Sequence, residues 1–232
     1  MAPKPKGRPK RKPTPKPQTA PKIKAKATPG APMGGKPIRP LSPRERDRRW
    51  ERTRTMMREQ GVECLLVFGS DREQVDNYLT NDIPGSTVIF PLEGAPVAIT
   101  RGHLVGTQIE SALRGEAVWV DDFRFRPGPA TIVNILKDKG CQRGTIGVVG
   151  AVGGSHFFPT GWVPSPTWMA IREALPHATF RDVSWPFMTM TLVRSEEELG
   201  LFRRAAAVSE LACQVMLDVI KPGVSEIGRA HV

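Results

Sequence analysis

The order of apolar and polar residues predicts a succession of strands and helices after residue 41. Continuous apolar runs are typical of buried strands, while apolar residues three or four positions apart indicate helices. Helices are expected over 43–59, 103–113, 130–139, 166–175 and 196–220. Strands are expected over 62–68, 86–90, 96–100, 117–120, 145–149 and 178–183. The second and third strands are separated by a short polar turn and should form an antiparallel hairpin.

The first predicted helix has well-defined ends. Ser42 can accept a hydrogen bond from a free amide, Pro43 suits the first helical position, and Glu45 can complete a capping box. Gly61 stands where a left-handed cap would end the helix. The arginine-rich remainder of the helix is expected to face solvent. Its apolar side consists of Trp50, Thr53 and Met57.

The last predicted helix, 196–220, opens with a second capping box formed by Ser195 and Glu198. Its acidic first turn suits the positive end of the helix dipole. Lys221, Pro222 and Gly223 are expected to end it. One side carries an apolar stripe that needs a partner, made of Leu199, Phe202, Ala206, Cys213, Met216 and Ile220.

Strands that alternate with helices indicate an α/β layered domain, and the hairpin makes its sheet mixed. Residues 41–190 have a length that suits one domain with its own core. The expected fold is therefore an α/β domain with a mixed sheet flanked by helices. A lone helix in residues 191–226 follows it.

The first 40 residues differ in composition from the rest of the chain. They hold 12 of the 34 Lys and Arg and 11 of the 23 Pro, but no Asp or Glu. The net charge of +11 therefore comes from this tail, because the remaining 22 basic residues face 23 acidic ones. With few large apolar side chains, the tail cannot offset the entropy lost on ordering, and disorder is predicted.

A short basic motif in this tail suggests a nucleic-acid interaction. The segment KGRPKRK resembles an AT-hook with lysine in place of its first arginine, and such a strip can lie in the minor groove of DNA. The alternatives are a solvated tail and a gene start placed upstream of a true start at Met33. The candidate DNA-contact residues are Lys6, Arg8, Lys10, Arg11 and Lys12.

Cysteine usage and hydropathy indicate the cellular compartment in which the protein is expected. Cys64, Cys141 and Cys213 show no metal-ligand spacing, which favours a reducing interior. No run approaches the roughly 20 apolar residues of a membrane helix, and the amino terminus lacks the apolar core of a secretory signal. We expect a cytoplasmic protein without membrane contact. An organellar transit peptide stays open as an alternative.

No set of residues in the sequence assembles a catalytic site. Asp121 and Asp122 are adjacent at a predicted strand end and should point to opposite faces. His156 lies in a glycine-rich loop without a nucleophile or carboxylate at a catalytic spacing, and that loop lacks the P-loop lysine. His103 and His177 are expected at the surface. We therefore assign no catalytic, cofactor-binding or metal-binding residue.

Four segments together resemble the creatinase, prolidase and aminopeptidase P family of "pita-bread" metallopeptidases. WERTRTMMREQGVECLLVFG, from Trp50, resembles the first helix and strand of the family. NYLTND, from Asn77, resembles its Tyr-Leu-Thr segment, with Asn81 where a glycine is usual. VRSEEELGLFRRA, from Val193, resembles the hinge into the catalytic domain, and KPGVSE, from Lys221, the turn that closes the first helix of that domain.

The resemblance implies a creatinase N-terminal-like domain that is noncatalytic, contributes to a homodimer and covers the partner's active site. In this family two Asp, one His and two Glu downstream of the closing turn hold two divalent metal ions, with manganese as the expected ion. The full-length parent would cleave Xaa-Pro peptides or a creatine-like compound. This chain would lack the metal-binding region and would be inactive by itself.

Residues 227–232 are expected to be foreign. Their sequence, IGRAHV, is what ATC GGA AGA GCA CAC GTC encodes, and that string matches the start of a common sequencing adapter. Such residues stay outside fold reasoning, so His231 is not counted as a metal ligand. Two other functions remain open: a DNA-binding or scaffolding protein that acts through its basic tail, and a hydrolase complete within these residues.

Overall fold

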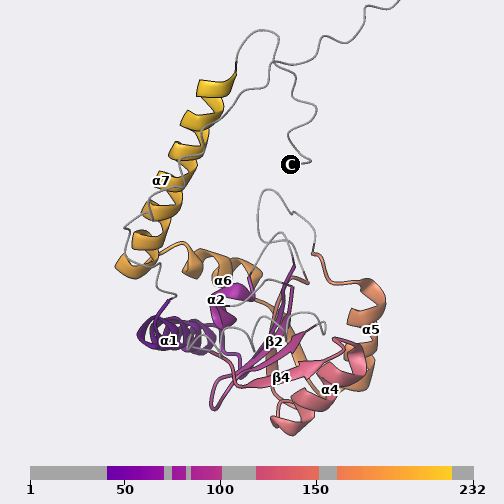
Figure 1. Ribbon diagram of the computed structural model, residues 1–232. Coiled ribbons are helices and arrows are strands. Elements are labelled where there is room, and N and C mark those ends of the chain that lie inside the picture. Colours follow the sequence, from indigo (N-terminus) through magenta and orange to yellow (C-terminus); the bar gives the residue numbers. More distant parts are fainter. Residues whose placement is uncertain (1–40, 71–74, 82–84, 101–118, 152–160, 221–232) are drawn as a thin grey trace, which may run out of the picture. The chain divides into compact units, whose positions relative to one another are not determined.

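A computed structural model describes residues 41–70, 75–81, 85–100, 119–151 and 161–220 (Figure 1). The described residues form a mixed sheet with strand order β4-β3-β2-β1-β5-β6. β2 is antiparallel to both of its neighbours, whereas β1 with β5, β3 with β4, and β5 with β6 are parallel pairs. The strands are β1 (Cys64–Phe68), β2 (Thr87–Pro91), β3 (Val97–Thr100), β4 (Asp122–Phe125), β5 (Thr145–Val149) and β6 (Thr179–Asp182).

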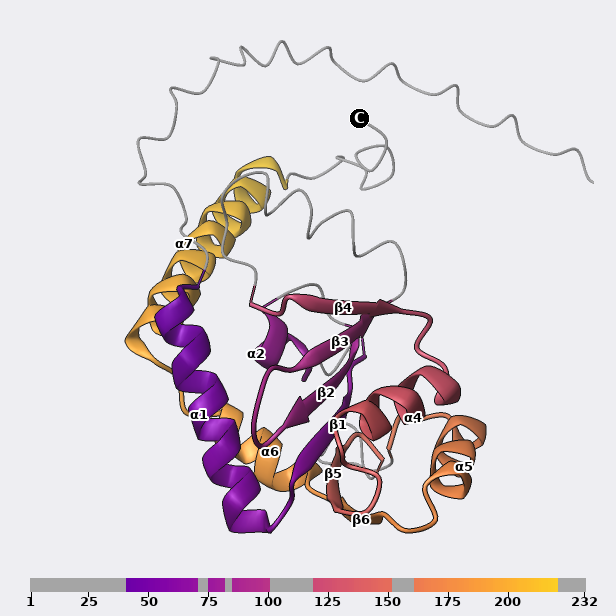
Figure 2. The same ribbon diagram turned by 90° about the horizontal axis from the view of Figure 1, so that it is seen from below.

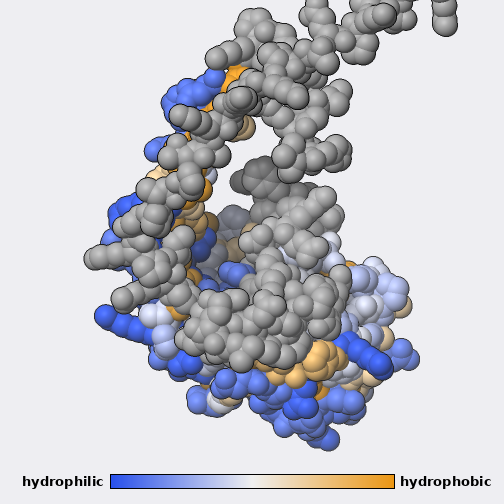
Figure 3. All heavy atoms as spheres, viewed as in Figure 1, coloured by the Kyte–Doolittle hydropathy of each residue, from blue (hydrophilic) through white to orange (hydrophobic). Residues whose placement is uncertain are grey.

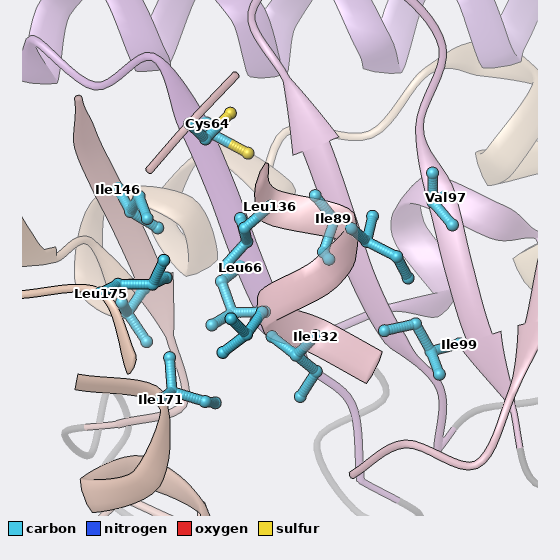
Figure 4. Packing of buried hydrophobic residues seen from close by; sticks show 14 of the residues in the cluster. Cys64, Leu66, Ile89, Val97, Ile99, Ile132, Leu136, Ile146, Ile171 and Leu175 are labelled. Carbon is cyan, nitrogen blue, oxygen red and sulfur yellow. The ribbon is translucent and has the colours of Figure 1, made fainter. Parts of the chain in front are cut away.

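Helices cover both faces of this sheet (Figure 2). Those in the described residues are α1 (Pro43–Gln60), α2 (Asn77–Thr80), α4 (Pro129–Asp138), α5 (Ser165–Ala174), α6 (Ser184–Thr191) and α7 (Glu196–Val219). Side chains alternate across β1, so Leu66 packs in the cluster with α4 and α5, while Leu65 packs in the cluster with α1, α2 and α6. In Figure 4, Leu66 faces Ile132 and Leu136 of α4.

The α/β class and most predicted elements are confirmed. The predicted hairpin is β2 and β3, and the first helix has its expected caps, with Ser42 accepting from the Glu45 amide and Gly61 left-handed at φ 62°. Asn81 adopts φ 51° at the end of α2, where the family resemblance led us to expect a glycine. Asparagine tolerates this left-handed region better than most residues do.

Three elements differ from the predictions, and the first is the short helix α2, which was not predicted. The strand expected over 117–120 is β4, which begins at Asp122, while Trp119 and Val120 are buried without belonging to a strand. The apolar run had indicated burial correctly but not backbone pairing. The helix α6 was not predicted, because of its eight residues only Ser184 and Phe187 are buried. The helix expected over 103–113 and the predicted disordered tail lie outside the described residues.

The prediction that the arginines of α1 face solvent is wrong for at least four of them. Arg48 binds Glu45 and Glu198. Arg49 is almost fully buried. Arg52 donates to the carbonyls of Met190, in the last turn of α6, and Val193, which follows that helix. Arg54 donates to the carbonyls of Leu92 and Gly94 in the hairpin turn. Guanidinium groups satisfy carbonyls that have no partner within a helix or strand. The polar side of α1 is therefore a packing surface.

The described residues also bear on membrane crossing and on disulfide bonding. None of the described helices combines the length and apolar character that a bilayer crossing requires. Cys64, Cys141 and Cys213 are free thiols, the first two buried and the third exposed.

Asp76 binds the residues just before β2 and lies close to Gly69, the residue that follows β1. Its Oδ2 accepts from the amides of Gly85 and Ser86 and from the Ser86 hydroxyl, at 2.8–2.9 Å. Burial raises the pKa of this carboxyl, although these hydrogen bonds act in the opposite direction. A Cβ added at Gly69 would lie 2.2 Å from Asp76 Oδ1 and 2.5 Å from the Ser86 carbonyl, so only glycine fits there.

We expect Gly69→Ala to lower the free energy of unfolding by about 1–3 kcal/mol or more, because the new methyl group overlaps a carboxylate that cannot withdraw. Gly200→Ala in α7 is the matched control, since nothing lies within 4 Å of its added Cβ, and it should cause no loss. Denaturant unfolding followed by tryptophan fluorescence measures both. Equal stabilities of the two variants would contradict the packing described at Gly69.

Candidate functional site

The candidate site is the junction where the first turns of α1 and α7 meet. Ser42, the N-cap of α1, accepts from the Glu45 amide, and its hydroxyl donates to Glu197 Oε2 at 2.8 Å. The Ser42 backbone N–H donates to the other oxygen of Glu197. A carboxylate from the first turn of α7 therefore serves the amino end of α1, where the helix dipole favours negative charge.

Glu198 is the centre of the junction, and its side chain is 3% exposed. Its Oε1 accepts from Arg49 and Arg194, each at 3.0 Å. Its Oε2 accepts from Arg48 at 2.8 Å and from the Ser195 amide at 2.9 Å. The Ser195 hydroxyl accepts from the Glu198 amide in return, which confirms the predicted capping box. One carboxylate thus caps α7 and binds three guanidinium groups.

Glu45 is the second carboxylate of the cluster. Arg48 binds it through two nitrogens, at 2.8 and 2.7 Å, and Arg49 Nε donates to it at 3.0 Å. Burial raises the pKa of Glu45, but hydrogen bonds from Arg48, Arg49 and Ser195 outweigh it and hold the pKa at about 2. The expected capping box of α1 does not form, because this carboxylate binds arginines instead of the Ser42 amide.

Arg49 joins the cluster to the sheet domain. Its guanidinium lies 4.8 Å from the Tyr78 ring centroid and 5.1 Å from that of Trp119, and Nη1 donates to the Tyr78 carbonyl at 3.2 Å. Cation–π contacts gain strength when they are shielded from water, as here. Removing one partner of such a buried cluster typically costs about 3–5 kcal/mol, since the other charge stays buried without compensation.

A cavity of about 560 Å³ lies beside the cluster. Its lining is mixed, with charged groups at the cluster end and apolar side chains elsewhere, and both the α/β domain and α7 contribute to it. The lining residues are Leu41, Arg49, Val75, Asn77, Tyr78, Asn81, Met188, Thr191, Arg194, Glu198, Leu201 and Phe202. Both carboxylates of the cluster are already bound by arginines, so they are not placed to act as a general base.

The implied pair of metal ions does not fit the described residues. No three His, Cys, Asp or Glu side chains in that part of the chain are grouped to hold a metal ion. Glu45 and Glu198 do come close to each other, but their oxygens accept from Arg48, Arg49 and Arg194. A cation would have to displace three guanidinium groups from this position, and we derive no metal chemistry from it.

The residues singled out in the sequence lie away from this junction or outside the described residues. His177 is exposed, and Asp122 in β4 pairs with Arg124 at 2.6 Å while Asp121 is exposed. His103, His156 and His231 lie outside the described residues, as do the tail positions Lys6, Arg8, Lys10, Arg11 and Lys12. The structure assigns no catalytic role to His177, Asp121 or Asp122.

Sequence reasoning missed the arginines of the junction. Arg49 and Glu198 are 149 positions apart, so no local pattern joins them. Two signals were present: consecutive arginines at 48 and 49 one turn after Glu45, and three consecutive glutamates opening α7. The arginines were attributed to solvent exposure and the glutamates to the helix dipole, because these are the commoner explanations.

Beyond the junction, α7 makes few contacts with the rest of the described chain. Every residue from Phe202 to Ile220 is exposed. Its apolar side chains extend around more than half of the helix at about 100° per residue, and they are visible along α7 in Figure 3. The large exposed ones are Phe202, Val208, Leu211, Val215, Met216, Leu217, Val219 and Ile220.

The architecture matches solved peptidase structures. The Xaa-Pro dipeptidase from Bacillus anthracis aligns with a TM-score of 0.57 and 21% identity, covering 78% of this chain and 46% of that chain. The X-Pro aminopeptidase from Thermotoga maritima MSB8 gives a TM-score of 0.58, 16% identity, and coverage of 74% and 44%. The prolidase from Thermococcus sibiricus gives 0.54, 15%, and coverage of 80% and 47%.

The chain shares the fold of the part of these peptidases with which it aligns. This confirms, at the level of the fold, the family resemblance carried by the four sequence segments. The chain spans about half the length of the prolidase and aminopeptidase structures that it matches. No protein-family model and no curated protein matches the sequence. At these identities the likeness shows the fold and does not by itself show an activity.

The low pKa of Glu45 makes a testable contribution to stability. A carboxyl whose pKa falls from about 4.5 in the unfolded chain to about 2 in the folded one stabilises the fold above pH 4.5. That contribution is lost as the pH falls from 4.5 to 2. We expect Glu45→Gln to be less stable than the natural chain by a few kcal/mol at pH 7, and the difference to shrink across this window.

Urea unfolding between pH 2 and pH 7 measures this difference. Glu51→Gln is the control, because Glu51 is exposed and pairs only with the exposed Arg58 in the described part of the chain. Its effect should stay within about 0.5 kcal/mol at every pH. A Glu45→Gln effect that does not change with pH would contradict the charged cluster.

Proposed function

We propose that this chain is the noncatalytic part of an Xaa-Pro peptidase-like metallohydrolase. The α/β domain would contribute to a homodimer and cover the partner's active site. α7 would be the first helix of a catalytic region that holds two divalent metal ions. By itself the chain is proposed to be inactive. In the full-length enzyme its α/β domain would influence the substrate only by covering the active site.

The observation that carries this proposal is the exposed apolar surface of α7. A helix on a protein surface usually has an apolar stripe a little over 100° wide, whereas the apolar side chains of α7 extend around more than half of it. One neighbouring helix would therefore leave part of this surface in water. Packing inside a larger domain would cover it, and each large side chain so buried contributes about 1.5–3 kcal/mol.

The fixed base of α7 supports the same proposal. Glu197 and Glu198 bind Ser42, Arg48 and Arg49, so the helix begins at a defined place on the α/β domain. Such a junction suits a boundary between two domains that keep one orientation. The prolidase fold adds support, because the solved structures that share it are about twice as long as the matched region.

The first test is the genomic sequence that follows the codon for Glu226. We expect an open reading frame that encodes two Asp, one His and two Glu as candidate ligands for two metal ions. The frame should continue without the adapter-like string that encodes residues 227–232. An uninterrupted genomic read that encodes His231 and Val232 and then a stop codon would contradict the proposal.

The second test is activity. The purified 232-residue chain with manganese should not hydrolyse a dipeptide with proline in second position, whereas the longer product of the same locus should. The longer protein with two of its metal-ligand carboxylates changed to alanine is the control for contaminating peptidases. Hydrolysis that copurifies with the 232-residue chain would show that a complete active site lies within it.

A further inference from the structure

Within the part of the chain that the structure describes, the first turn of α7 supplies nearly all the contacts that hold this helix. From Phe202 onward each residue is exposed, so packing adds little to its stability. A helix without tertiary packing is marginal in water, because closing the first turn fixes several residues for one hydrogen bond. Whatever stabilises the first turn of α7 therefore decides how much of the 24-residue helix is formed.

That first turn is stabilised by a carboxylate with two tasks. Glu198 Oε2 accepts from the Ser195 amide, which belongs to the capping box, and from Arg48 of α1. Oε1 accepts from Arg49, also of α1, and from Arg194. The arginines hold Glu198 in the rotamer that the cap requires. Conversely, the cap places the carboxylate where α1 can bind it.

We propose that Glu198 makes the formation of α7 conditional on its contact with α1. When the first turn is docked, the side chain of Glu198 is already ordered and α7 propagates from it. When the contact opens, the capping box must order that side chain alone and α7 frays. The junction is thus a positioning device that couples the helical state of α7 to the α/β domain. This inference concerns the chain itself and does not rest on the proposed function.

The test is hydrogen exchange measured by mass spectrometry on the 232-residue chain. Arg48→Met removes the hydrogen bonds of Arg48 to Glu198 and to Glu45, at a side chain that is 30% exposed. Because the loss at Glu45 also weakens the α/β domain, we expect amides of α7 to exchange at least tenfold faster in this variant and by a clearly larger factor than amides of β1. Arg58→Met on the same helix is the control, since its ion pair with Glu51 is exposed and distant from the junction.

A second pair of variants changes α7 itself. Glu198→Gln keeps the size of the side chain but removes its charge, and it should raise exchange across α7 as Arg48→Met does. Glu210→Gln, an exposed glutamate of the same helix, should leave exchange unchanged. Because the contact of Arg48 with Glu198 is one of those that Glu198→Gln already weakens, the double variant should exchange α7 no more than about twice as fast as Glu198→Gln alone.

Two results would overturn the proposal. One is α7 exchange in Arg48→Met that equals exchange in Arg58→Met, which would show that α7 forms without the contact. The other is a parallel rise in α7 and β1, which would mean that the cluster only stabilises the whole domain. If Glu198→Gln does not fold, Arg48→Met and its control still decide between these outcomes.

Discussion

The structure depends on the way in which α1 uses its arginines. Arg49 lies over the rings of Tyr78 and Trp119 and binds two carboxylates, while Arg52 and Arg54 donate to carbonyls at the end of α6 and in the β2–β3 turn. Each of these carbonyls would otherwise lack a partner where the chain leaves a regular element. One helix therefore connects the hairpin, α6 and the start of α7, and all three are positioned by side chains that look like ordinary surface charges in the sequence.

The class of the fold was predictable because it depends on periodic burial. The residues Leu65 and Leu66 lie in a continuous apolar run and pack on opposite faces, as a buried strand requires. The capping residues Ser42 and Ser195 were also predictable, since each acts on amides within three positions. Periodic burial and helix capping can be predicted from one sequence, because they do not depend on which distant segments pack nearby.

The position of β4 and the arginine contacts of Glu45 were not predictable, because they depend on contacts between distant segments. β4 is an edge strand whose residues are not buried, so it has no apolar run, whereas Trp119 has a strong apolar signal and no strand pairing. Glu45 fits the pattern of a capping box yet binds Arg48 and Arg49, since a buried guanidinium competes for its carboxylate. In both cases a correct local rule gave way to a tertiary partner.

The burial of the α1–α7 junction also determines how it responds to ionic strength. Counterions weaken interactions between exposed charges over a Debye length of about 8 Å at physiological salt, but they cannot approach charges enclosed by protein. Glu45, Arg49 and Glu198 are each less than 5% exposed. The contacts of Arg49 with Glu45 and Glu198 are therefore less sensitive to the salt concentration than exposed ion pairs such as Arg58–Glu51.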